Sequence, residues 1–131
     1  MQYRPTVSEC KHLFNFVNAL AFNGIMVSPV FKLKNIKHDG YADIRKYHPG
    51  TITLRKIYPC YAMFIASLIH ELVHVYIAKV LGDRVNCYPH GKEFKRICKI
   101  VKKALPTLDI AASYWAASLT DPRNNKRTNK L

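Results

Sequence analysis

The sequence predicts a single α+β domain in which an N-terminal helix and a small sheet precede two further helices. Three observations support this prediction. The chain has 131 residues, of which 49% are apolar and 22% charged, as expected for a globular protein with one core. Apolar residues recur at helical spacing in three segments. Short segments bounded by turn residues, two of them with alternating side chains, lie between the first two helices.

The first helix is predicted over residues 6–23, where apolar side chains recur three or four residues apart. Thr6 or Ser8 could cap its start, and Gly24 could end it. The apolar residues of this segment are Leu13, Phe14, Val17, Leu20 and Ala21.

Three short segments, residues 29–36, 41–47 and 51–57, are predicted to be strands. Turn signals separate them, one at residues 38–40 (His-Asp-Gly) and one at residues 49–50 (Pro-Gly). We therefore expect a small, three-stranded, mainly antiparallel sheet.

The longest apolar run covers residues 61–81 and ends at Gly82, a suitable C-terminal cap. About 20 residues could span a membrane, but His70, Glu71 and His74 would be costly in lipid. We therefore expect a helix buried in the core of the domain.

Residues 1–10 lack an apolar signal region, so we expect a protein of the cytoplasm, the nucleoid or the nucleus. Cysteines in such a protein are expected to be reduced. Their expected role is that of small apolar side chains that fill the core.

A further helix is predicted from about residue 91 to residue 105, before Pro106 stops it. One face is apolar and the opposite face is basic. The apolar residues are Phe94, Ile97, Cys98, Val101 and Leu105. Residues 108–119 could form another short helix, and residues 121–131 form a basic polar tail that we expect to be disordered.

The segment His70-Glu71-Leu72-Val73-His74 places two histidines and a glutamate inside the longest apolar run. Residues four apart on a helix lie about 40° apart around its axis and about 6 Å along it. Both imidazoles can therefore reach one metal ion, for which Zn²⁺ is the natural choice. Glu71 lies beside them, where it can act as a general base toward water.

A catalytic zinc usually has a third protein ligand. The metzincin pattern is excluded, because position 77 is isoleucine and position 80 is valine. Two candidates remain downstream, His90 and Glu93. The glutamate corresponds to the thermolysin-like arrangement.

The charge balance points to a polyanionic partner. Twenty-one Lys and Arg against eight Asp and Glu give a net charge of +13 with His neutral, which favours nucleic acid through phosphate contacts and not base recognition. The basic residues on the exposed face of the last predicted helix, which we expect to contact DNA, are Lys92, Lys95, Arg96, Lys99, Lys102 and Lys103.

With these motifs in view, the chain resembles the SprT-like zinc metalloproteases, which include the Spartan-type enzymes that degrade DNA-crosslinked proteins. The resemblance rests on the HExxH motif at residues 70–74, on the block His90-Gly91-Lys92-Glu93-Phe94, and on the order of helix, three strands and metal helix. It implies a zincin-like fold in a minimal domain over residues 1–120. The sequence contains neither the cysteine zinc ribbon nor the long tail of some members, so any DNA binding is expected from the domain or its short basic end.

The resemblance also implies roles for individual residues. It assigns one Zn²⁺ per chain to His70, His74 and His90, and catalysis to Glu71. Glu93 is then no ligand, and Phe94 packs the last helix onto the metal helix. The group that stabilises the oxyanion is not identified by the sequence; Tyr88 and Tyr114 are the candidates considered.

These observations predict a zinc-dependent metalloendopeptidase that acts on DNA-bound or DNA-crosslinked proteins and has no membrane partner. One alternative is a non-catalytic DNA-binding module with a structural zinc. The other is a thermolysin-like peptidase unrelated to DNA, with Glu93 as the third ligand. The presence of Glu71 disfavours the first alternative, and the charge of +13 disfavours the second.

Overall fold

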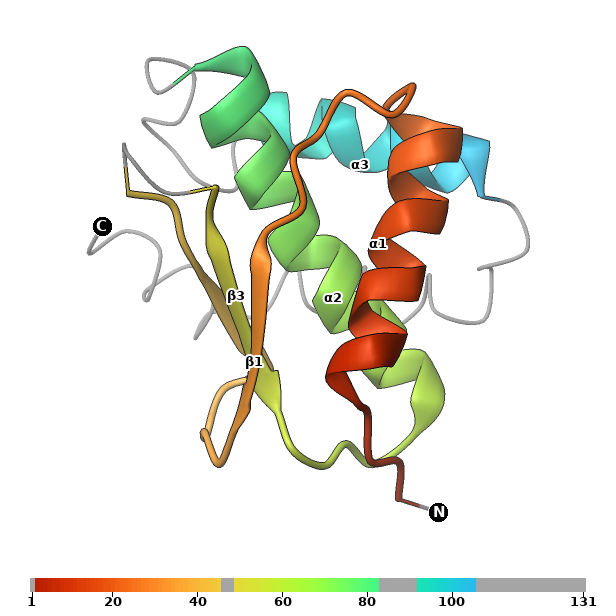
Figure 1. Cartoon of the computed structure of the whole chain (residues 1–131). Coiled ribbons are helices and arrows are strands. Elements are labelled where there is room, and N and C mark those ends of the chain that lie inside the picture. The colour runs from red at the N-terminus through yellow and green to blue at the C-terminus, as the bar shows by residue number, and fades with distance from the viewer. Residues whose placement is uncertain (1, 46–48, 83–91, 106–131) are drawn as a thin grey trace.

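The computed structural model describes residues 2–45, 49–82 and 92–105. The elements in these residues confirm the predicted α+β class and the predicted order (Figure 1). The helices are α1 (Val7–Ala21), α2 (Tyr61–Tyr76), its π-helical continuation η1 (Ile77–Leu81) and α3 (Lys92–Ala104), and the strands are β1 (Val30–Lys34), β2 (Gly40–Asp43) and β3 (Thr51–Arg55). The short helix expected over residues 108–119 and the tail from residue 121 lie outside the described residues.

The prediction of a mainly antiparallel sheet is wrong. The strand order is β1-β3-β2, with β1 parallel and β2 antiparallel to the central β3. The central place of β3 agrees with its burial, since Ile52, Thr53 and Leu54 are all buried. The five residues 35–39 suffice to cross two strand spacings, about 10 Å, and so carry the chain past β3.

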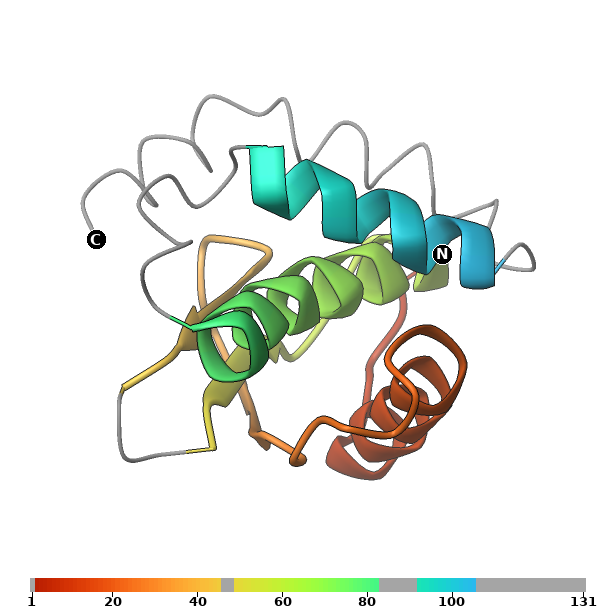
Figure 2. The ribbon, with the colours of Figure 1, turned by 90° about the horizontal axis from the view of Figure 1, so that it is seen from above.

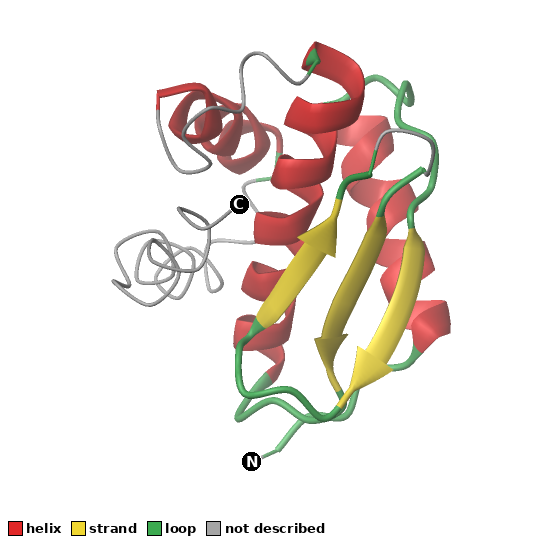
Figure 3. Cartoon of the chain, turned by 90° about the vertical axis from the view of Figure 1, so that its left-hand side faces the viewer, coloured by secondary structure: helices red, strands yellow, loops and turns green. Residues whose placement is uncertain are grey.

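The helices cover one face of this sheet (Figure 3), and α2 lies between the sheet and α3 (Figure 2). Phe31 pairs with Ile52 in register and packs against Phe14 of α1, with ring centroids 6.3 Å apart. Alternation along the strands therefore turns the neighbouring Lys32 and Lys34 to the opposite face.

Helix α1 begins with a capping box, which confirms the prediction for Thr6. Thr6 Oγ1 accepts a hydrogen bond from the Glu9 amide at 3.1 Å, and Glu9 Oε1 accepts one from the Thr6 amide at 3.1 Å. At the other end, buried Asn18 forms two hydrogen bonds to the backbone of Met26, each 3.1 Å long. Asn18 thereby holds the segment that leads into β1.

Helix α2 is the core helix that the sequence predicts. Its residues from Phe64 to Val75 are all buried. Among the described residues, Tyr61–Leu81 is the one helix long and apolar enough to cross a membrane, but 78% of the relevant window is buried inside this protein. The apolar run is therefore accounted for by the protein's own core.

Two of the cysteines are apolar fillers, as predicted. Cys10 lies in α1 and Cys98 in α3, and both are buried. Burial raises the pKa of Cys10 to about 11 and that of Cys98 to about 12, so both thiols stay protonated at neutral pH. Cys87 lies outside the described residues.

Gly40 of β2 lies against Leu54 and Thr53 of β3 and beside Glu71 of α2. A Cβ atom at this position would lie 2.9 Å from Leu54 Cδ2, 3.2 Å from the Thr53 carbonyl oxygen and 3.5 Å from Glu71 Cγ. The first of these contacts is too short for any real pair of carbon atoms. A side chain larger than hydrogen would therefore press against β3, whereas its distance to Glu71 Cγ would be an ordinary van der Waals contact.

We predict that Gly40→Ala lowers the free energy of unfolding by about 1 to 3 kcal/mol, the usual cost of overpacking a core. Urea denaturation measures this change. The control is the same substitution in a Leu54→Val background, which removes the clashing Cδ2 atom and should relieve most of the cost. An equal cost in both backgrounds would show that the contact with Leu54 is not the cause.

Candidate metal centre

His70 and His74 lie one turn apart on the buried part of α2, with exposed fractions of 1% and 7%. Their Nε2 atoms are 3.3 Å apart. Two nitrogen ligands at about 2.05 Å from a tetrahedral zinc ion are expected to lie about 3.3 to 3.4 Å from each other. The two imidazoles are therefore positioned to share one metal ion. The same separation also suits an N–H···N hydrogen bond between two neutral rings, which is the simpler structural alternative.

Phe94 of α3 covers the two histidines. Its ring centroid lies 4.9 Å from that of His70 and 4.6 Å from that of His74, and the side chain is 1% exposed. The expectation that Phe94 packs α3 onto the helix that carries the two histidines is confirmed. An apolar ring in this position excludes water from one side of the site and lowers the local dielectric constant.

Glu71 is 3% exposed and lies close to the point where β2 meets α2, at Gly40. Beyond this contact, the buried Tyr58 hydroxyl donates a hydrogen bond to the carbonyl of Asp39 and accepts one from the Arg55 amide at 3.1 Å. Burial raises the pKa of Tyr58 well above its usual value, and the carboxylates of Asp39 and Glu71 act in the same direction. Tyr58 therefore remains a hydrogen-bond donor and fixes the residue before Gly40.

The sequence analysis missed Gly40 and Tyr58 as supports of the site. Gly40 was interpreted only as part of a turn signal, because its proximity to Glu71 depends on the pairing of β2 with β3. Tyr58 follows β3 with no motif around it. The one signal that the sequence offers for Tyr58 is a large aromatic ring in the short connection between β3 and α2.

His90, the expected third ligand, and Gly91 lie outside the described residues, as do Tyr88 and Tyr114. Within residues 2–45, 49–82 and 92–105, no group of three or more His, Cys, Asp or Glu side chains could hold a metal ion. Glu93 does lie in the described part of the chain. Its Oε1 accepts a hydrogen bond from Arg96 Nε at 3.0 Å. This ion pair joins residues three apart on α3.

The two faces of α3 are as predicted. Phe94, Ile97, Cys98 and Val101 are buried, whereas the six basic residues listed above are exposed. We refer to Lys92, Lys95, Arg96, Lys99, Lys102 and Lys103 as the α3 stripe. The stripe lies on the side of α3 opposite Phe94, so its cations point away from His70 and His74.

Comparison with known proteins gives one match. Neither the curated proteins nor the solved structures contain one that matches this chain. The model of the SprT-like family matches residues 10–114. Because this match covers most of the 131 residues, including the HExxH motif, the three strands and the described helices from residue 10 onward, the chain belongs to the SprT-like family.

Proposed function

We propose that this protein is a zinc-dependent metalloendopeptidase that acts on DNA-bound or DNA-crosslinked proteins. The observation that supports it most directly is the 3.3 Å separation of the His70 and His74 Nε2 atoms, with Glu71 beside them in the core of a SprT-like chain. The family is one of metalloprotease-related proteins.

In this proposal His70 and His74 hold the metal, and His90 supplies the third ligand. Zinc, when bound, supplies Lewis acidity that polarises the scissile carbonyl and makes water a better nucleophile near neutral pH. Glu71 accepts the proton of the attacking water and then delivers it to the leaving nitrogen. Its burial beside Gly40 keeps the carboxylate in one place and limits competing solvent.

A purely structural zinc site explains Glu71 less well. Burying a carboxylate in a core costs several kcal/mol unless it is compensated, and a structural site with histidine ligands does not need a general base. The net charge of +13 disfavours the thermolysin-like alternative, which has no nucleic-acid partner.

The charge supports the nucleic-acid part of the proposal. The α3 stripe contributes six cations on one helix face, with Glu93 as the one acid of that helix. An excess of +13 over the whole sequence favours association with phosphates. Since the stripe faces away from His70 and His74, the nucleic acid would concentrate the enzyme on its substrate without entering the metal centre. A location in the cytoplasm, nucleoid or nucleus follows from such a partner.

The metal assignment can be tested by zinc analysis. The purified protein should hold about one Zn²⁺ per chain after dialysis, measured by plasma mass spectrometry. His70→Ala, His74→Ala and His90→Ala should each lose the metal, whereas Glu93→Ala should keep it. Wild-type protein that holds no zinc, with a melting temperature unchanged by added zinc, would favour the hydrogen bond between the histidines instead. Loss of zinc from Glu93→Ala but not from His90→Ala would support the thermolysin-like arrangement.

The catalytic assignment can be tested with Glu71→Gln, which keeps the shape of the side chain and removes the base. This variant should keep its zinc content and its far-UV circular dichroism. Cleavage of an unfolded or DNA-bound protein substrate should fall at least ~100-fold, the usual scale for the loss of a general base. Equal rates for the variant and the wild type would contradict the mechanism.

A further inference from the structure

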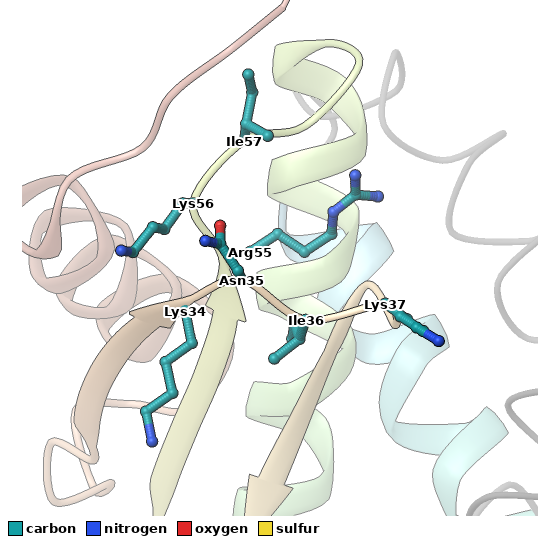
Figure 4. Close-up of a pocket in the computed structure, with 7 residues that line it drawn as sticks. All are labelled: Lys34, Asn35, Ile36, Lys37, Arg55, Lys56 and Ile57. Carbon is teal, nitrogen blue, oxygen red and sulfur yellow. The ribbon is translucent and has the colours of Figure 1, made fainter.

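A basic hollow lies at the end of the sheet, where β1 and β3 both stop (Figure 4). Its volume is about 280 Å³, and we call it the sheet-end hollow. The parallel pairing of β1 with β3 creates it, because this register places Lys34 opposite Arg55. The Lys56 amide then donates a hydrogen bond to the Lys34 carbonyl at 3.2 Å. The lining residues are Lys34, Asn35, Ile36, Lys37, Arg55, Lys56 and Ile57.

The cations of the hollow differ in how the protein itself engages them. Arg55 lies 3.7 Å from Asp39 and stacks over the Tyr58 ring at 5.5 Å, so it already has partners. Lys34, Lys37 and Lys56 are exposed, and none of the ion pairs among the described residues involves them. Three like charges gathered at one end of a sheet repel each other, and an anionic ligand would relieve that repulsion.

The directions of these side chains indicate what kind of anion suits them. In Figure 4 the ammonium groups of Lys34, Lys37 and Lys56 point to different sides of the hollow. A single small anion binds best where several donors converge on one point, which is not the arrangement here. A polymer with a phosphate at every step can meet separate cations in turn as it crosses the rim.

We propose that the sheet-end hollow binds the phosphate backbone of a nucleic acid through Lys34, Lys37 and Lys56. This surface is separate from the α3 stripe, because it is built from β1, β3 and their loops. The inference rests on the proposed association with nucleic acid, and it is independent of the peptidase chemistry. Some of the cations behind the net charge of +13 would then have a specific role at the sheet-end hollow, which helical periodicity does not reveal.

The test is the salt dependence of binding to a labelled DNA duplex, measured by fluorescence anisotropy. Lys37→Gln and Lys56→Gln together remove two cations on different sides of the hollow, at positions outside the strands. The slope of log K against log salt is negative, and each lost phosphate contact should make it less steep by about 0.9. The double variant should therefore lose up to about 1.8 units of slope.

The matched control is the double variant Lys11→Gln with Arg45→Gln, which removes the same charge from α1 and from the opposite end of the sheet. Its slope should stay close to that of the wild type. Equal slopes for both double variants would overturn the proposal, because they would show only a dependence on net charge. A third arm, Lys95→Gln with Lys99→Gln, tests the α3 stripe separately, so its result leaves the conclusion on the hollow unchanged.

Two further readouts separate this inference from others. Inorganic phosphate should compete with DNA no better than chloride at equal ionic strength, since the lysines do not converge; selective competition by phosphate would indicate a small-anion site and overturn the proposal. Zinc content and cleavage of a short peptide should be the same in the hollow variant and the wild type. A wild type that is inactive as a peptidase but shows the expected slopes would contradict the proposed function and leave the hollow intact.

Discussion

The structure depends on the burial of His70, Glu71 and His74 within the central helix α2. Polar groups in a core are costly unless they are bonded to something, and the rest of the fold is arranged around these three. Phe94 covers the histidines from α3, and Gly40 lets β2 approach the glutamate from the sheet. The proposed metal ion would give these buried residues a role that leucine or valine could not take.

The chemistry and the charge are separated in space. The histidines and the glutamate are almost fully buried, whereas the cations lie on the outer face of α3 and at the end of the sheet. This separation suits an enzyme whose substrate is selected by its attachment to a polyanion, because each surface can be used without disturbing the other. The two basic surfaces also have different origins. The α3 stripe follows from helical periodicity, and the sheet-end hollow follows from the pairing of β1 with β3.

The helices were predictable because their signals are local. Thr6 and Glu9 form the capping box from residues three apart, and the buried and basic faces of α3 follow directly from a period of 3.6. The strand topology was not predictable in the same way. Three short strands with turns between them do not reveal that the last one takes the central place. Gly40 and the hollow were missed for that reason, since both acquire their neighbours through the pairing of the strands.

The most direct measurement is X-ray diffraction from crystals of the zinc-loaded protein, with data collected on both sides of the zinc absorption edge. The account predicts one anomalous peak per chain, about 2.0 to 2.1 Å from the Nε2 atoms of His70 and His74, with His90 as the third protein ligand. It would be contradicted by crystals in which these two nitrogens are hydrogen-bonded to each other without a peak between them.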